Sequence, residues 1–431
     1  MKKFFCCLIL VFIALSGCGK SSSLEQGEEV TEIIWWSGDG HSEQCYRELI
    51  SEFNSTIGKQ NNIKITLEVY SDYNRILAEA VANNSEPDFM GLGDYISFKD
   101  AVENELIVPL TSVKGLEKFL ENNYGCYVEG KNMYHGEIYG INNAAILIGL
   151  VYNKDMFVEA GLVDEQGEAK PPATIDEMVA YAHRLTDYSE NKFGFIMPMK
   201  WNSWFRYELQ NPSQSITGMK NGVYDLEEQK IDFNGIKPLA EAYLQMKKNG
   251  SIYPGEQEMS NEIARAIFSS GNVGMKMCAI WDIGVFGDQF LPEFDWGVAP
   301  IPGNSEGDSY SHYKEPSTSL YISKKALEEK NPEKVAIAYS FIYGDYAMQK
   351  LYRDGVNIPW RAELITDENL ENTKVGWSDF GKILKLTELE ENDDNSGLVL
   401  LNKGIQEDFI NNVWSGTVSL DEWIEKKNGD E

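Results

Sequence analysis

Strand-like and helix-like segments alternate from residue 31 onward, and this order constrains the fold more than any other feature of the chain. Residues 31–36 and 63–69 have the apolar patterns of strands, and each is followed by a helical pattern. A third, short strand is expected at residues 89–94, where it runs into a loop that contains glycine. Because strands and helices alternate, the sequence predicts an α/β fold with a parallel sheet and helices on its faces.

The same kind of pattern returns with different contents farther along the chain. Residues 144–152 are a continuous apolar strand candidate, and Thr174 with Glu177 makes a capping box at the start of a helix. Two further helices are expected to end at Gly250 and near Gly271. A chain of 431 residues exceeds one typical domain, so we expect two lobes, each with its own core. The remaining expected elements are a helix capped by Asp72, a strand at residues 320–322 and a helix at residues 335–343.

The chain begins with the features of a secretory signal. Lys2 and Lys3 precede an apolar run, and small residues then stand directly ahead of Cys18. The stretch Leu15-Ser16-Gly17-Cys18 resembles the lipobox of bacterial lipoproteins, in which the peptide is cut before the cysteine and the cysteine carries lipid. A membrane-spanning anchor is disfavoured because the apolar run is shorter than the roughly 20 residues that a spanning helix needs. We expect a signal peptide at residues 1–17, and a lipidated Cys18 with a flexible tether at residues 18–30.

The composition is strongly acidic. The full chain has 38 basic and 68 acidic residues, a formal net charge of −30, and loss of Lys2 and Lys3 with the signal makes it −32. Nucleic acids, polyanionic substrates and anionic lipid head groups need clustered Lys and Arg, so this balance argues against all three. It favours a neutral or cationic ligand, or simply a soluble acidic surface.

Cysteines and histidines give no sign of a metal or redox centre. With the signal removed and Cys18 lipidated, Cys45, Cys126 and Cys278 remain, widely separated and without Cys-x-x-Cys spacing. At most one disulfide is possible among them, and buried free thiols are the simpler interpretation. The four histidines share no helical or turn spacing, so we expect no zinc site, and we expect no other cofactor.

Patterns that would indicate an enzyme are weak. Residues 303–307 match Gly-x-Ser-x-Gly by letter, but a nucleophile elbow needs a strand before it and a helix after it, and no helical periodicity follows here. A glycosidase needs two carboxylates across a cleft, and 68 acidic residues make some such pair inevitable. Residues 393–397 lack the alternate ligand spacing and the closing Glu of a calcium loop. We therefore expect a protein that is not an enzyme.

Five segments, in order along the chain, carry one family resemblance. Residues 154–162 read Lys-Asp-x-Phe-x-x-Ala-Gly-Leu, and residues 171–177 read Pro-Pro-x-Thr-x-Asp-Glu, with Ile175 where the family has tryptophan. Phe268-x-x-Gly271 leads to Met275 and Trp281, with Gly274 in place of an alanine, residues 296–303 contain Gly-x-x-Pro-x-Pro-Gly, and residues 414–422 are similar to a closing Gly-x-x-Ser-x-Glu-Glu. Together they resemble family 1 of the extracellular solute-binding proteins of ABC importers, the sugar-binding, maltose-binding-like proteins.

The resemblance implies a periplasmic-binding-protein-like fold, in which two α/β lobes are joined by crossing hinge strands and a ligand is buried in the cleft by hinge closure. The chain differs from the family at one point, because it has Pro316-Ser317 where a Gly-Gly pair is usual. This difference affects the expected ligand contacts of that segment and leaves the expected fold unchanged. Lobe 1 is expected to comprise residues 31–143 and 317–356, and lobe 2 residues 144–316 and 357–431, with crossings near 142–146, 315–319 and 355–360.

A sugar presents apolar C–H faces and a rim of hydroxyls, so a sugar site needs aromatic rings and fixed hydrogen-bonding partners. Such residues are expected on loops that follow strands, at the lobe edges. Trp281 stands where the family has a tryptophan that often serves as a stacking platform, although lobe core is an equal alternative, while Trp35 and Tyr343 are expected in the core. The candidate ligand-binding residues are Trp36, Asp39, Asp94, Asn143, Trp204, Arg206, Trp281, Trp360 and Arg361.

These features predict a monomeric, lipid-anchored protein on the extracytoplasmic face of the cell membrane. It would capture a mono- or oligosaccharide and deliver it to the membrane permease subunits of an ABC importer. Two alternatives stay open: an extracellular glycan-processing lipoprotein enzyme, and a binding protein that presents its ligand to a sensor kinase. The fold also hosts other small solutes, so the sequence leaves the identity and length of the ligand undetermined.

Overall fold

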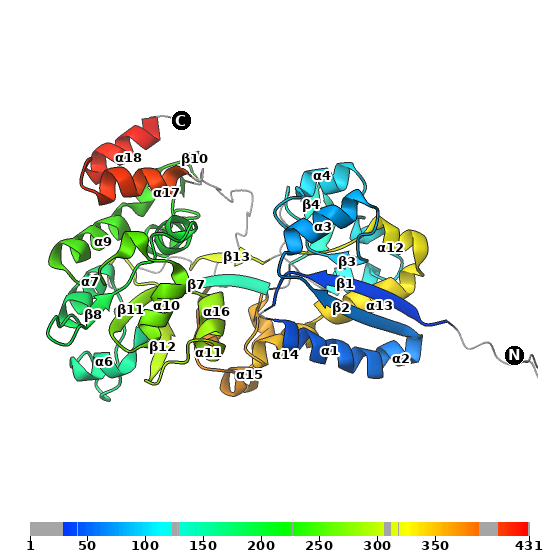
Figure 1. The fold of residues 1–431 in the computed structure, drawn as a ribbon, viewed down its shortest axis with the longest axis horizontal. Helices are drawn as coiled ribbons and strands as arrows, with labels where there is room; N and C mark the ends of the chain where they lie inside the picture. The colour runs from blue at the N-terminus through cyan, green and yellow to red at the C-terminus, as the bar shows by residue number, and fades with distance from the viewer. Residues whose placement is uncertain are drawn as a thin grey trace, which may run out of the picture.

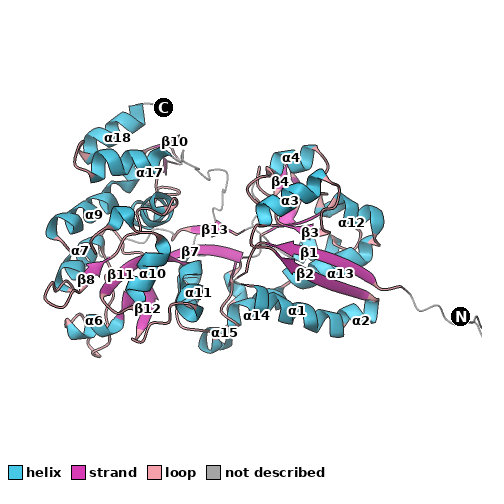
Figure 2. Ribbon diagram, in the orientation of Figure 1, coloured by secondary structure: helices cyan, strands magenta, loops and turns pink. Residues whose placement is uncertain are grey.

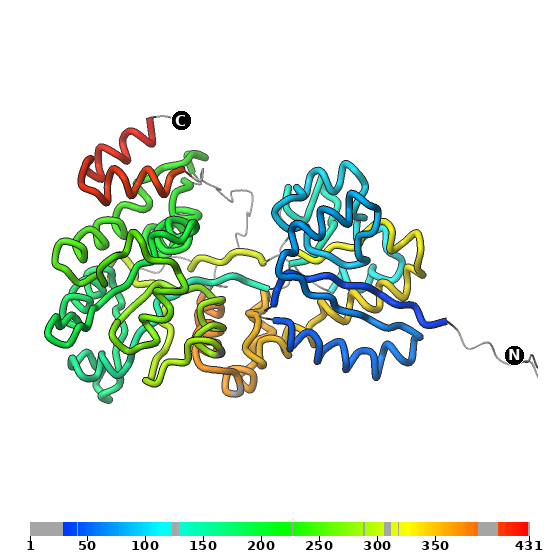
Figure 3. Tube along the Cα trace, viewed as in Figure 1, coloured from blue at the N-terminus to red at the C-terminus, as the bar shows by residue number. Residues whose placement is uncertain are grey.

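A computed structural model describes residues 29–40, 42–122, 127, 129–142, 144–225, 227–305, 312–317, 319–387 and 404–429. Two lobes lie side by side, each built from a sheet covered by helices (Figure 1). Strands and helices are interspersed in both lobes (Figure 2). The chain enters lobe 1 at its outer end and finishes in a helix on lobe 2 (Figure 3). The predicted two-lobed α/β fold is confirmed.

Lobe 1 contains a five-stranded sheet in the order β2-β1-β3-β14-β6. Its strands are β1 (Thr31–Ser37), β2 (Ile63–Val69), β3 (Phe89–Met90), β6 (Gly140–Ile141) and β14 (Leu320–Ile322). β1 runs parallel to β2 and β3, as predicted, whereas β14 runs antiparallel to β3 and β6. The prediction of a parallel sheet is therefore correct for the first three strands and wrong for the edge that β14 and β6 form. Periodicity cannot reveal that edge, because β14 joins the sheet from far along the chain.

The helices of lobe 1 bury apolar faces against this sheet. Leu49 and Phe53 of α1 are fully buried, as their spacing predicts. Asp72 stands at the N-cap position of α3, but its carboxylate accepts from Arg75 Nε at 2.5 Å and makes no capping bond, which corrects the predicted role. The elements are α1 (Glu43–Ser55), α2 (Ile57–Asn61), α3 (Tyr73–Ala82), α4 (Phe98–Glu103), η1 (Leu110–Ser112), α5 (Glu117–Asn122), α12 (Lys324–Glu329), α13 (Pro332–Tyr343) and α14 (Asp345–Arg353), with a hairpin of β4 (Met133–Tyr134) and β5 (Glu137–Ile138).

Lobe 2 is built around β7 (Ala144–Asn153), β8 (Phe193–Phe195), β11 (Val273–Ala279) and β12 (Trp296–Ala299), in the order β12-β7-β11-β8. β11 and β12 run antiparallel to β7, and β11 runs parallel to β8. All of the side chains of β7 except one are buried, which accounts for its continuous apolar run. A small hairpin of β9 (Tyr224–Asp225) and β10 (Lys230–Ile231) stands apart from this sheet.

The helices of lobe 2 begin and end at the residues that the sequence marks. Thr174 Oγ1 accepts from Glu177 N at 3.1 Å at the start of α7, and Gly250 follows α9 with a left-handed φ of 78° that suits glycine. The elements are α6 (Lys154–Glu159), α7 (Ile175–Arg184), the π-helix η2 (Phe205–Gln210), η3 (Asn211–Ser213), α8 (Gln214–Thr217), η4 (Phe233–Ile236), α9 (Lys237–Asn249), η5 (Glu256–Glu258), α10 (Asn261–Ser269), α11 (Ile280–Asp288), η6 (Ala362–Leu364), α15 (Asp367–Asn372), α16 (Trp377–Thr387), α17 (Gly404–Phe409), the π-helix η8 (Ile410–Trp414) and α18 (Leu420–Gly429).

Three chain segments run side by side between the lobes. β13 (Lys314–Pro316) and β15 (Ile358–Pro359) both pair antiparallel with the first residues of β7, and Pro316 and Ile358 both lie opposite Ala145. β7 and β13 lie at the waist of the molecule in Figure 1. These are the segments in which the sequence places crossings, and we propose that the lobe boundaries lie there.

The two described cysteines are buried and free, as expected. Cys45 lies in α1 and Cys278 in β11. Cys126, Cys18 and the proposed signal peptide lie outside the described residues. Within the described part of the chain, no helix has both the length and the apolar character needed to cross a membrane.

Candidate ligand-binding cleft

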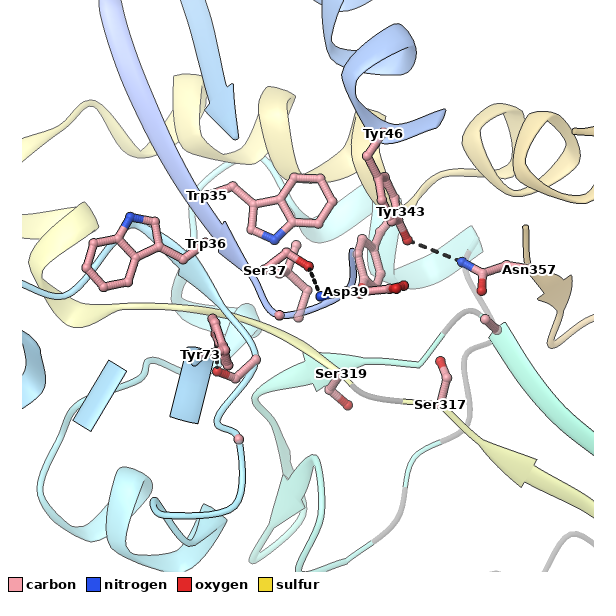
Figure 4. A pocket seen from close by; sticks show the side chains of 15 residues that line it. Trp35, Trp36, Ser37, Asp39, Tyr46, Tyr73, Ser317, Ser319, Tyr343 and Asn357 are labelled. Carbon is pink, nitrogen blue, oxygen red and sulfur yellow. Dashed lines mark hydrogen bonds between the residues drawn. The ribbon is translucent and has the colours of Figure 1, made fainter. Parts of the chain in front are cut away.

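A first cavity, of about 460 Å³, lies where the end of β1 meets the crossing segments. Trp36, Ser37 and Asp39 come from the end of β1 and the loop after it, and Ser317, Ser319 and Asn357 from the crossing segments. In Figure 4, Trp35, Tyr46 and Tyr343 lie on the side of β1, and Ser317 and Ser319 lie across from them on the crossing segments. The remaining lining residues are Trp35, Gly38, Tyr46, Tyr73, Gly91, Gly93, Ala144, Leu320 and Tyr343.

The alternation of β1 gives its two tryptophans different surroundings. Trp35 is 4% exposed and packs edge-on against Tyr46, with ring centroids 4.8 Å apart. Trp36 faces the other side of the strand, where it meets Tyr70 edge-on at 5.0 Å. Its indole Nε1 is buried and has no hydrogen-bond partner among the described residues. Both residues line the cavity, although the sequence predicts only Trp36 to do so.

Asp39 is exposed at the junction of β1 and α1. Its Oδ2 accepts from Ser42 Oγ at 2.5 Å, and its Oδ1 lies 3.3 Å from Ser42 N, where it accepts again. Ser42 is the N-cap residue of α1, so the start of this helix orients the carboxylate. The predicted acceptor therefore stands in a fixed position at the rim of the cavity.

A second cavity, also of about 460 Å³, lies between the lobes and shares Asp39 and Asn357 with the first. Lobe 1 lines it with the first turns of α1, and lobe 2 with the start of α11 and with Trp377 of α16. The remaining lining residues are Ser42, Gln44, Cys45, Glu48, Ile280, Trp281, Gly284, Asp354, Gly355, Val356 and Lys374. The two cavities therefore adjoin at these two shared residues.

Trp281 and Trp377 make the lobe 2 wall of the second cavity partly aromatic, and two further rings that do not line the cavity pack against Trp281. Trp281 meets Tyr207 edge-on, with centroids 4.9 Å apart, and Tyr207 stacks on Trp201 at 5.8 Å and 15°. The helix that carries Trp281 is fixed at its start, because Asp282 accepts from Ala279 N at 2.8 Å and from Arg265 Nε at 2.6 Å. Trp281 is half-buried, so part of its indole stays available to a ligand.

The lobe 1 wall of the second cavity is acidic, because Asp39, Glu48 and Asp354 line it. Burial favours the neutral form of Asp354, but hydrogen bonds from Lys350 Nζ at 2.6 Å and from Cys45 Sγ at 3.4 Å outweigh burial and lower the pKa of Asp354. Burial and the neighbouring Asp354 raise the pKa of Cys45 to about 12, so this thiol stays protonated and unreactive.

Two of the predicted ligand contacts are buried in the structure. Trp204 is fully buried in the lobe 2 core, where it packs against Phe205 and Phe409 and has no surface to offer a ligand. Trp360 is 6% exposed, and Lys314 Nζ lies 3.9 Å from its ring centroid, so a cation covers one face of the ring. Neither residue lines either of the two cavities.

The remaining predicted residues are held by partners beside the cavities. Arg206 pairs with Glu315, Arg361 pairs with Asp345 and Glu363, and Asp94 exchanges hydrogen bonds with Asn74 at 2.8 and 3.2 Å. None of these three lines either cavity. Asn143 lies outside the described residues. Of the nine candidates, the structure therefore brings Trp36, Asp39 and Trp281 together along the cleft.

Several cavity residues are missed by sequence reasoning. Ser317 and Ser319 lie in the second crossing and Asn357 at the third, so the position of the crossings signals them even though their types are common. Tyr343 shares a helical apolar face and is 8% exposed, as core residues are, yet it also lines the first cavity. Tyr73 and Trp377 carried no local signal.

The comparison with known families identifies the class of protein that this fold and cleft define. The family of bacterial extracellular solute-binding proteins matches residues 42–345, and the chain belongs to it. An arabinooligosaccharide-binding protein of Bacillus subtilis is 23% identical over 328 residues, which cover 72% of this chain and 70% of that protein. A binding protein of Brucella abortus is 26% identical over 197 residues, and the chain spans about half of its length, 45%.

Solved structures of similar fold come from sugar-binding proteins. The sugar-binding protein MalE of Xanthomonas citri has a TM-score of 0.64 and 18% identity, over 92% of this chain and 95% of that one. Unliganded RafE of Streptococcus pneumoniae has a TM-score of 0.60 and 18% identity, over 89% of this chain and 94% of that one. At such identities the likeness establishes the fold.

Proposed function

We propose that this protein captures a carbohydrate in the cleft between its lobes and delivers it to the permease of an ABC importer. The observation that supports this most is the pair of adjoining cavities, with aromatic residues from both lobes and polar residues shared between the cavities. Trp36 and Trp281 offer flat apolar surfaces for the C–H faces of sugar rings, and Asp39 and Asn357 offer hydrogen-bonding groups for hydroxyls. These four residues are the proposed contacts.

The comparisons favour a sugar over other solutes. The Bacillus subtilis relative is an arabinooligosaccharide-binding protein, and similar structures include RafE in complex with raffinose and a Listeria monocytogenes protein in complex with cycloalternan. The strong acidic charge of this chain agrees with a neutral ligand. Because two cavities adjoin through Asp39 and Asn357, we propose an oligosaccharide that occupies both.

The proposed cellular setting follows from the start of the chain and from the family. We propose that Cys18 carries lipid after removal of residues 1–17, and that the monomeric protein is tethered to the outer face of the cell membrane. Closure of the lobes on the ligand would then present a closed form to the membrane subunits. Closure requires that the ligand bind the closed form more tightly than the open form, which contacts from both lobes provide.

A thermal-shift screen of the chain begun after Cys18 tests the proposal. Mono- and oligosaccharides are compared with amino acids and polyamines as controls. A ligand at 100 times its Kd stabilises the folded protein by about 2.7 kcal/mol, a readable rise in Tm. We expect one saccharide series to raise Tm, with a larger rise for longer members. A rise with amino acids or polyamines alone would exclude the sugar, and release of free sugar from an oligosaccharide would show an enzyme instead.

A further inference from the structure

We propose that Glu315 is a positioning residue at the joint between the lobes. It fixes the aromatic wall of the second cavity and, through Lys131, ties that wall to lobe 1. Glu315 belongs to β13, one of the crossing strands, and its side chain is only 8% exposed. That this wall contacts a ligand rests on the proposed function. The contacts of Glu315 with the wall and with Lys131 do not depend on it.

On the lobe 2 side, Glu315 holds two consecutive residues of the π-helix η2. Arg206 Nη2 donates to Glu315 Oε1 at 2.7 Å, and Tyr207 Oη donates to Oε2 at 3.5 Å. The buried hydroxyl of Tyr313 also donates to Oε2. Burial opposes the charge on Arg206, but the carboxylate of Glu315 outweighs it, and the pKa of Arg206 is raised. The carboxylate is therefore anchored firmly within lobe 2.

Tyr207 connects Glu315 to the aromatic wall of the second cavity. Its hydroxyl is held by Glu315, and its ring contacts Trp281 edge-on at 4.9 Å and Trp201 in a stack at 5.8 Å. The guanidinium of Arg206 lies over the same ring, 5.0 Å from its centroid, and makes a cation–π contact with it. Because one end of Tyr207 is fixed at the crossing strand, its ring determines where the indole of Trp281 stands in the cavity.

On the lobe 1 side, Lys131 Nζ lies 3.9 Å from Glu315 Oε1, the oxygen that Arg206 also contacts. The backbone carbonyl of Lys131 accepts from Tyr321 Oη at 2.6 Å, and Tyr321 belongs to β14 in the lobe 1 sheet. Lys131 is thus held in lobe 1 while its charge points at the joint. A hinge motion that opens the lobes would move Lys131 away from Glu315 and leave the Arg206–Glu315 pair intact. The distance between Lys131 and Glu315 therefore depends on how far apart the lobes are.

Small-angle X-ray scattering of the ligand-free protein tests the link between the lobes. In Lys131→Gln the charge that draws lobe 1 to the joint is lost, so we expect a larger radius of gyration than in the wild type. Lys114→Gln is the matched control, because Lys114 is an exposed lobe 1 lysine whose partner, Glu333, lies in the same lobe. Lys131→Arg keeps the charge and should restore the wild-type radius. An unchanged or smaller radius in Lys131→Gln would overturn this part of the inference.

Near-ultraviolet circular dichroism tests the effect on the aromatic wall. Glu315→Gln keeps the shape of the side chain and removes its charge, so Tyr207 and Trp281 should reorient and change the aromatic signal. We expect that change to shrink by at least half when the substitution is made in a Trp281→Ala background. An equal change in both backgrounds would show that Glu315 does not act on Trp281. Both measurements are free of ligand, so a failure of saccharide binding would refute the proposed function and leave this inference standing.

Discussion

At the scale of residues, the cleft shows which side chains a sequence can assign to a site. Trp36, Asp39 and Trp281 were predictable because each follows a strand pattern or occupies a family position, and all three line the cavities. Trp204 was proposed by the same reasoning but is fully buried, and Phe409 from the C-terminal region packs against it. Whether a loop tryptophan is core or platform depends on partners more than 200 positions away, and local pattern carries no information about them.

Trp281→Ala should weaken saccharide binding by at least tenfold, which corresponds to about 1.4 kcal/mol. The loss follows from removal of the half-buried ring that forms the lobe 2 face of the second cavity. Isothermal titration calorimetry measures it, with Leu291→Ala as a control that shortens an exposed apolar side chain of lobe 2. An affinity equal to that of the control would contradict the assignment of Trp281.

At the scale of elements, most helices and strands were predictable, and their long-range pairings were not. The buried run of β7 and the N-cap of α7 are local signals, and both appear as expected. The predicted capping box is only half formed, because the Glu177 carboxylate accepts from Ala173 N and not from Thr174 N. The pairing of β13 and β15 with one strand joins segments about 170 and 210 positions from it, and only the family resemblance suggested it. The π-helix η2 was also not predicted. It places the buried carboxyl of Glu208 2.6 Å from Lys276 Nζ of β11.

This pair predicts a pH dependence of stability. Burial raises the pKa of Glu208 to about 7, with Lys276 opposing the shift, whereas an unfolded carboxyl titrates near 4.5. Between about pH 4.5 and 7, Glu208 therefore holds a proton in the folded state that it releases in the unfolded state. Its stabilising contribution is fully present below about pH 4.5 and is lost as the pH rises through about 7, by about 3 kcal/mol at most.

Glu208→Gln removes this titration. We expect the free energy of unfolding of the wild type, relative to that of Glu208→Gln, to fall between pH 4.5 and 7 in urea denaturation. Glu165→Gln, at an exposed position of lobe 2, is the control substitution. Parallel stabilities of wild type and Glu208→Gln across that range would show that Glu208 does not titrate there.

At the scale of the whole molecule, the segments that cross between the lobes at the waist also line the proposed binding cleft. β7 runs through the waist as a strand of lobe 2, and β13 and β15 pair with its first residues (Figure 1). The two cavities lie along this joint and draw on both lobes and on the crossing segments. A ligand that fills both would therefore touch both lobes and the crossing segments, which is the arrangement that couples binding to closure.

Hydrogen exchange with and without a saturating saccharide tests this account most directly. If the ligand binds between the lobes, amides of residues 35–46 in lobe 1 and of residues 280–284 in lobe 2 should gain protection together. The crossing residues 355–357 should gain protection with them, because they line the same cavities. Protection confined to one lobe, or located away from these segments, would contradict capture of the sugar in the cleft.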